Sequence, residues 1–217
     1  MADFPATHLS LVMAAAGSDK ALADLLEIYW RPLYVFVRRQ GHSEEESKDL
    51  TQGFIAHLLE KGGLREFQHQ RGRFRSFLLG SLNNFLANER DRATAQKRGG
   101  GVSPVPLDSA IQPPDNLTPE RIFEKQWALA LLNRALERVR PGNHFERLRG
   151  YLTGDDDGVR YAQLGLELGM SEGAVKVAVH RLRRRFHEAL REEISMTVTE
   201  ESQIGGELRY LVAAIRS

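Results

Sequence analysis

The clearest candidate chemistry in the sequence is a cluster of basic side chains in its last third. Between Tyr161 and Arg185, apolar residues recur at helical spacing on both sides of Gly169-Met170-Ser171. Gly169 suits a left-handed backbone position, and the Ser171 hydroxyl can cap the amide groups that open a second helix. The pattern predicts two short helices joined by a tight turn, the helix-turn-helix arrangement.

The second of these helices is expected to bury one row of side chains and to turn a basic row toward solvent. Five cations fall within ten residues with no acid among them, and phosphate groups would relieve their mutual repulsion. A short, rigid, cationic helix fits the major groove of duplex DNA. The alternative is an ordinary helical hairpin with a solvated basic face. The residues expected to contact DNA are Ser171, Glu172, Lys176, Val177, His180, Arg181, Arg183 and Arg184.

No residues have the spacing of a catalytic or metal site. The seven histidines are scattered, and none belongs to a His-Glu-x-x-His pair. The segment Asp155-Asp156-Asp157-Gly158 lacks the alternate spacing and the terminal glutamate of a calcium loop, so we interpret it as a solvated turn. A glycine-rich phosphate loop and a nucleophile elbow are also missing. We therefore expect a protein that is not an enzyme and that uses no metal or cofactor.

Composition narrows the class of protein further. The formal net charge of +1 excludes a globally basic coat, so a role with nucleic acid must rest on local patches. The absence of cysteine excludes disulfides and thiolate metal sites, and it fits a reducing compartment. No apolar run approaches the roughly 20 residues that span a bilayer. No basic leader precedes the apolar stretch Leu9 to Ala16, so we expect a cytoplasmic protein without membrane insertion.

The first half of the chain reads as three helices. The first covers about 21–40 and contains Pro32, which predicts a kink or two abutting helices there. The second opens at the capping box Ser43-Glu44-Glu45-Glu46. The third covers 73–98 and is stopped by three consecutive glycines.

The second half of the chain follows a proline-rich stretch, since five of the eight prolines lie between 102 and 119. A helix is expected from Pro119 with Thr118 as its cap, and a short amphipathic helix is expected at Leu208 to Ile215. No β pattern of useful length appears. The prediction is an all-α fold with two small helical domains and a Pro/Gly-rich linker, divided as an N-terminal domain 1–98, a linker 99–118, a helix-turn-helix domain 119–191 and a C-terminal extension 192–217.

Two stretches upstream of the helix-turn-helix carry a family resemblance. Asp49-Leu50-Thr51-Gln52 lies on a predicted helix, and it is followed by Gly72-Arg73-Phe74-Arg75-Ser76-Phe77-Leu78 and by Asn84. In this order and separation, these motifs resemble the bacterial extracytoplasmic-function (ECF) sigma factors, the small two-domain initiation subunits of RNA polymerase. The resemblance covers roughly Leu22 to Leu190, and the segment after Arg191 is additional to it, which suggests a divergent branch.

The resemblance implies core RNA polymerase and promoter DNA as partners, and a regulatory protein such as an anti-sigma factor as a further one. In the family, the domain that carries the first motif docks on the polymerase clamp, and the tract 73–92 reads and opens the minus-ten element. Melting requires capture of unstacked bases and of their backbone. Polymerase contacts are expected from Asp49, Leu50, Gln52 and Phe54, and minus-ten contacts from Asn83, Asn84, Asn88, Arg90 and Arg92.

By the same resemblance, the second helix of the helix-turn-helix reads the minus-thirty-five element. Glu172 could accept a hydrogen bond from a cytosine amino group, or it could stabilise the helix dipole without DNA. We therefore expect a sigma factor that binds core polymerase and directs promoter-specific initiation. The alternative is a helix-turn-helix regulator that never joins the polymerase. A third class, a helical adaptor that binds only proteins, predicts that reversing Lys176 and Arg181 to glutamate changes nothing.

Overall fold

The computed structural model of this chain describes residues 19–60, 73–98, 117–142, 144–152, 158–198 and 200–216. These ranges are almost entirely helical and contain no strand, so the predicted all-α fold class is confirmed. Most of the predicted linker 99–118 and all of Asp155 to Asp157 lie outside the described residues. Within the described ranges, no helix combines the length and the apolar composition that a bilayer crossing requires.

The helices group into two compact units whose bounds differ from the predicted domains. The first unit contains Met1–Ala130 and Ser195–Ser217, and the second contains Leu131–Ile194. Helix α6 (Pro119–Val139) therefore contributes its first half to one unit and its second half to the other. Phe123 and Trp127, in the first half of α6, are buried in the core of the first unit, so this compact unit extends past the predicted domain boundary at residue 119.

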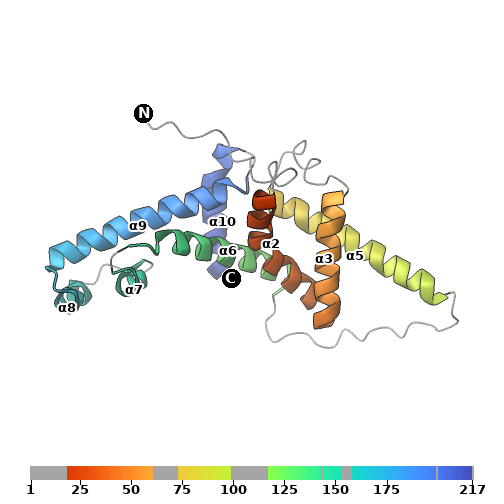
Figure 1. Ribbon diagram of the computed structural model, residues 1–217, viewed down its shortest axis with the longest axis horizontal. Coiled ribbons are helices and arrows are strands. Elements are labelled where there is room, and N and C mark those ends of the chain that lie inside the picture. Colours follow the sequence, from red (N-terminus) through yellow and green to blue (C-terminus); the bar gives the residue numbers. More distant parts are fainter. Residues whose placement is uncertain are drawn as a thin grey trace. The chain divides into compact units, whose positions relative to one another are not determined.

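The first unit contains α2 (Asp19–Arg39), α3 (Glu44–Glu60), α5 (Phe74–Arg98) and α10 (Ile204–Arg216), together with the first half of α6. Helices α2 and α3 lie side by side (Figure 1). Helix α2 continues through Pro32 as one helix, so the alternative of two abutting helices is wrong. Tyr29 and Leu33, on either side of the proline, are both buried, and this shared burial holds the helix together.

Helix starts in the first unit follow the predicted capping chemistry. The N–H of Ser43 donates to the Glu46 carboxylate at 2.8 Å, and the N–H of Glu46 donates to the Ser43 hydroxyl at 3.2 Å. This reciprocal pair is the capping box that opens α3. At the start of α6, the N–H of Arg121 donates to the Thr118 hydroxyl at 3.3 Å. Both caps satisfy amide groups that have no partner inside their helix.

Aromatic pairs connect the helices of the first unit. Each pair joins two helices, and burial of such a side chain contributes about 1.5–3 kcal/mol. The contacts connect α2 to α5, α2 to α6 and α3 to α5, so α6 is part of the same core as the N-terminal helices. The pairs are Tyr29–Phe74 with ring centroids 5.3 Å apart, Phe36–Phe123 at 6.4 Å and Phe54–Phe85 at 5.8 Å.

The second unit contains the second half of α6, then α7 (Phe145–Leu148) with the 3-10 turn η1 (Arg149–Tyr151), α8 (Gly158–Leu168) and α9 (Glu172–Ser195) up to Ile194. The predicted helical row of α6 is buried in this unit at Leu131, Ala135 and Val139. From α9, Val175 and Val179 are also buried. Helices α8 and α9 lie on either side of residues 169–171, and the helix-turn-helix function of this pair stays a prediction.

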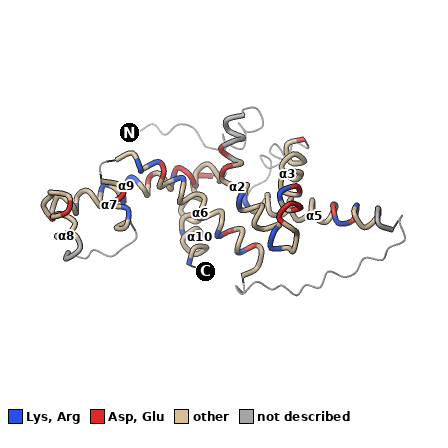
Figure 2. Tube along the Cα trace, turned by 60° about the horizontal axis from the view of Figure 1, so that its bottom comes forward, with Lys and Arg blue, Asp and Glu red and all other residues tan. Residues whose placement is uncertain are grey.

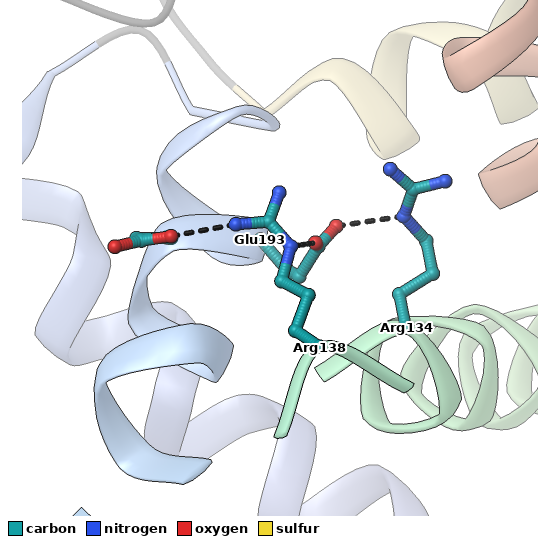
Figure 3. Close-up of polar contacts among 4 residues, drawn as sticks. Arg134, Arg138 and Glu193 are labelled. Atoms are coloured by element: carbon teal, nitrogen blue, oxygen red, sulfur yellow. Dashed lines mark hydrogen bonds and ion pairs between the residues drawn. The ribbon is translucent and has the colours of Figure 1, made fainter. Parts of the chain in front are cut away.

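A buried carboxylate joins α6 to α9 in the second unit. The side chain of Glu193 is completely buried and lies between the guanidinium groups of Arg134 and Arg138 (Figure 3). Its two oxygens are 2.8 Å from Nε of Arg134 and 2.5 Å from Nε of Arg138. Arg138 also pairs with Glu192 at 2.6 Å. Because a buried charge is costly unless it is paired, these two arginines allow Glu193 to be buried.

Replacing Glu193 tests this cluster. Glu193→Ala leaves Arg134, whose side chain is 18% exposed, without its carboxylate, while the more exposed Arg138 can be rehydrated. We expect the free energy of unfolding in urea to fall by about 2–3 kcal/mol. The matched control is Glu137→Ala, which removes an exposed carboxylate from α6 and should change it by no more than about 0.5 kcal/mol. Equal effects of the two substitutions would contradict the assignment.

Candidate nucleic-acid interface

Two glycines and a serine shape the turn between α8 and α9. Gly169 has a φ of 65°, in the left-handed region that favours glycine, as predicted. The N–H of Met170 donates to the carbonyl of Gly165 at 2.8 Å, and a Cβ at Gly165 would lie 2.6 Å from the Met170 carbonyl oxygen. The Ser171 hydroxyl accepts from the N–H of Ala174 at 3.2 Å, which caps α9. Sequence reasoning missed Gly165, because only the close approach of the turn reveals its role.

Helix α9 divides its side chains into the predicted buried and exposed rows. Val175, Val179 and Leu182 are buried, and Phe186 is half-buried. The opposite row is accessible to a partner along its whole length, and it includes an exposed valine of the kind that can contact a thymine methyl group. The exposed residues are Ser171, Glu172, Lys176, Val177, His180, Arg181 and Arg184.

The charges of this exposed row are held by weak pairs within the helix. Lys176 lies 2.7 Å from Glu172, and Arg184 lies 2.9 Å from Glu188, each one turn away. Exposed pairs of this kind contribute little to stability, so a phosphate can replace the carboxylate at small cost. Arg181 makes no ion pair with any residue that the structure describes. Lys176, Arg181 and Arg184 are therefore the cations best placed for phosphate.

Two other arginines of α9 anchor the helix to the backbone of its own unit. Nε of Arg183 donates to the carbonyl of Tyr151 at 2.9 Å, and the Arg183 side chain is half-buried. Arg185 donates from Nη2 to the carbonyl of Pro141 at 3.3 Å. Arg183, which the sequence predicts as a DNA contact, thus uses its Nε for a hydrogen bond within its own unit, because Tyr151 approaches α9 at that point.

Helix α5 presents its amides and arginines on the outer side. Asn83, Asn84, Asn88, Arg90 and Arg92 are all exposed. Basic and acidic positions alternate near the end of the described part of the helix (Figure 2), and Arg92 pairs with Glu89 at 2.6 Å. The alternation keeps this face close to neutral, so its amides are the more distinctive feature. Amide groups can pair with base edges, and the arginines can contact the backbone.

Arg90 also influences a histidine at the start of α3. Burial lowers the pKa of His42, the Glu46 carboxylate opposes this effect, and the charge of Arg90 adds to it. With a lowered pKa the imidazole is neutral at pH 7. Of these two side chains, only Arg90 carries a positive charge at pH 7.

The residues predicted to contact polymerase differ in their accessibility. Asp49 and Gln52 are exposed on α3, and Leu50 is half-buried. Phe54 is only 1% exposed, and its ring packs on Phe85 of α5. Its direct contact with a partner stays a prediction, and in this chain the ring is covered by Phe85. Phe54 faces the core because it follows the buried Thr51 at a spacing of three, whereas Asp49 and Gln52 lie on the other side of the helix.

The chemistry offered by these surfaces is hydrogen bonding and ion pairing. The rows on α3, α5 and α9 supply carboxylates, amides and guanidinium groups, which bind polar and anionic partners reversibly. Among the described residues, no three or more His, Asp or Glu side chains are grouped so that they could hold a metal ion.

Comparison with known families gives a match for most of this chain. The family model described as ECF sigma factor matches residues 7–192. The match includes α3, α5, α8 and most of α9, and it ends before α10. No curated protein and no solved structure matches the chain.

The close approach in the turn predicts opposite effects for two glycine substitutions. In Gly165→Ala the new methyl group collides with the Met170 carbonyl, so we expect the free energy of unfolding to fall by about 1–3 kcal/mol. In Gly173→Ala nothing lies within 4 Å of the new Cβ, and helix propensity should raise stability by about 0.5 kcal/mol. Urea unfolding measures both values. A Gly165→Ala protein as stable as the parent would refute the packing argument.

The different environments of Arg181 and Arg183 predict that DNA binding and stability are affected separately. Arg181→Ala should reduce the number of counterions released on duplex-DNA binding by about one, which is read from the salt dependence of the affinity. It should change the free energy of unfolding by no more than about 0.5 kcal/mol. Arg183→Ala should lower the free energy of unfolding by about 1 kcal/mol, because the partly buried Tyr151 carbonyl loses its charged donor. Fluorescence anisotropy and urea unfolding provide the two measurements. The reverse pattern would contradict these assignments.

Proposed function

This chain belongs to the ECF sigma factor family, and we propose that it binds core RNA polymerase and directs initiation of transcription at specific promoters. The observation that carries the proposal is the family match over residues 7–192, which includes both the α3–α5 region and the turn between α8 and α9. Sigma factors are regulatory subunits rather than enzymes. The polymerase supplies the chemistry of RNA synthesis, and this chain supplies differences in binding energy.

The exposed end of α3 is the proposed docking site for polymerase. Asp49 and Gln52 are exposed there, one turn apart, and Leu50 beside them is half-buried. A carboxylate and an amide beside a partly accessible apolar side chain suit a protein interface with a polar rim. Phe54 contributes indirectly, since its packing on Phe85 holds α3 against α5.

Helix α5 is the proposed reader of the minus-ten element. Asn84, Asn88 and Arg92 recur at spacings of four and therefore form one exposed row. Asn83 and Arg90 form a neighbouring row, seven residues apart. A single strand laid along these rows would meet amides for base edges and guanidinium groups for phosphates, which favours capture of unstacked bases.

Helix α9 is the proposed reader of the minus-thirty-five element. Its exposed row offers Lys176, Arg181 and Arg184 to phosphates, and His180 and Val177 to base edges. The Ser171 cap and the Gly165 contact hold the N-terminal end of the helix in place, which is the end that contacts bases in helix-turn-helix proteins. Glu172 takes part in the pair with Lys176, so its freedom to accept from cytosine depends on that pair opening.

We assign each functional domain by the partner that it would bind, so the bounds of these domains differ from those of the compact units. The proposed domains remain an N-terminal polymerase and minus-ten domain at 1–98, a linker at 99–118, a minus-thirty-five domain at 119–191 and an extension at 192–217. The proposed location is the cytoplasm, where the polymerase and promoter DNA are found. An anti-sigma protein is a further proposed partner, because such regulators are typical of the family.

Reconstitution with core polymerase tests the proposal. The purified chain and core enzyme should initiate transcription on promoters selected from a pool of random upstream sequences. In the double variant Asp49→Ala, Gln52→Ala, we expect affinity for core enzyme to fall at least about tenfold, as loss of a charge-assisted hydrogen bond predicts. DNA binding by the free chain should be unchanged.

The control for this experiment is Glu44→Ala. Glu44 is exposed on the same helix and is turned about 140° from Asp49. Its removal changes the charge by the same amount as Asp49→Ala and should leave core binding intact. If the chain does not bind core polymerase but binds a specific duplex by itself, the protein is a separate DNA-binding regulator and the proposal is wrong.

A further inference from the structure

The C-terminal helix lies beyond the family match and packs in the first unit. The match ends at residue 192, whereas α10 covers Ile204–Arg216. Its buried row is Ile204, Glu207, Leu211 and Ala214, while Val212, which the sequence places on the docking face, is 45% exposed. The helix is thus turned so that an acid, rather than Val212, faces the core.

That acid, Glu207, pairs with the two arginines at the start of α5. Its side chain is 1% exposed. One carboxylate oxygen is 2.5 Å from Nε of Arg73, and the other accepts from Nη1 of Arg75. An antiparallel backbone bridge between Arg73 and Val198 holds the preceding segment at the same place. The tail therefore meets α5 through both its backbone and a buried carboxylate.

Two aromatic rings contact the Arg75 guanidinium. Its carbon lies 4.7 Å from the ring centroid of Trp127 and 4.1 Å from that of Tyr210. Trp127 belongs to α6 and is completely buried, whereas Tyr210 belongs to α10. Burial, and then a hydrogen bond with Glu124, raises the pKa of Tyr210, so this ring carries no charge at neutral pH. If α10 left, Arg75 would lose Glu207 and Tyr210 and would keep Trp127.

We propose that α10 is an intramolecular latch in which the Glu207 carboxylate occupies a site at Arg73 and Arg75 that binds a backbone phosphate of single-stranded DNA when the latch opens. This inference rests on the proposed contact between α5 and promoter DNA. Arg73, at the start of α5, precedes Asn84 by eleven residues, which is about 16 Å and close to three full turns, so both lie on the same side of the helix. A strand held by Asn84 can therefore reach Arg73, and the Glu207 carboxylate that would be replaced contacts both Arg73 and Arg75.

The latch is built so that a phosphate can compete with it. Glu207 gives Arg75 one oxygen, and Nε of Arg75 has no hydrogen-bond acceptor among the described residues. A phosphate offers more acceptor atoms to the same guanidinium fork. Helix α10 has 13 residues, a length at which an isolated helix is only marginally stable in water. Its stability therefore depends on its contacts with the first unit, and the whole helix can detach when those contacts are lost.

Two variants of the full-length chain test the latch by different routes. Glu207→Gln removes the competing charge, and Tyr210→Ala uncovers Arg75 without changing the net charge. Binding to oligodeoxythymidine of about 20 nucleotides, without polymerase, should tighten at least about threefold in both. Amide hydrogen exchange in α10 should accelerate at least about tenfold, while exchange in α2 and α3 stays unchanged. Adding Arg73→Gln to Glu207→Gln should abolish most of the gain.

The charge control is Glu201→Gln, which removes an exposed carboxylate from the same tail. Equal tightening in Glu201→Gln and Glu207→Gln would show a general charge effect and overturn the proposal. It would also be overturned if Tyr210→Ala left DNA affinity unchanged, or if exchange in α2 and α3 accelerated together with α10, since α10 would then be a fixed part of the core. Both measurements omit polymerase, so a failure of polymerase binding in the reconstitution experiment is recognised separately.

Discussion

A buried glutamate held by two arginines recurs in both compact units, and the placement of the C-terminal third of the chain depends on it. In the second unit, Glu193 of α9 meets Arg134 and Arg138 of α6. In the first unit, Glu207 of α10 meets the arginine pair at the start of α5. Apolar contacts are non-directional and tolerate small shifts between helices. A buried carboxylate does not tolerate such shifts, because separation from its partners leaves it without water and without a counter-charge. These pairs therefore select one register for α9 and one for α10.

Hydrogen bonds to backbone carbonyls distinguish two of the basic residues of α9. Arg183 and Arg185 donate to backbone carbonyls of the segments that precede α8. Arg181 and Arg184 are exposed, and Arg185 is exposed as well, four residues after Arg181 on the same face. A hydrogen bond to a carbonyl leaves the guanidinium charge in place, so Arg183 and Arg185 still add to the positive charge of the helix. In the proposed complex with DNA, these two bonds would hold α9 rigidly and so fix the positions of its exposed side chains.

The compact units and the proposed functional domains divide this sigma factor at different places. The first half of α6 belongs to the core of the N-terminal helices through Phe123 and Trp127, although it follows the proline-rich stretch. The C-terminal segment also returns to that core. A helix from beyond the family match consequently covers two arginines that precede the proposed minus-ten surface on the same helix. A segment that follows the family match can in this way reach a proposed binding surface without changing the residues that form that surface.

The sequence by itself determined the features that repeat within a few residues: the helices, the Ser43–Glu46 capping box, the turn at Gly169 and the exposed row of α9. These are local because helical spacing and capping involve neighbours three or four residues apart. Only the tertiary structure decided that Phe54 packs on Phe85, that Arg183 bonds to the Tyr151 carbonyl and that Arg75 meets Glu207, 132 positions later. No local pattern encodes such partners. A buried charge must be neutralised by whichever opposite charge the fold brings within a few ångströms, and that choice exists only once the helices have packed.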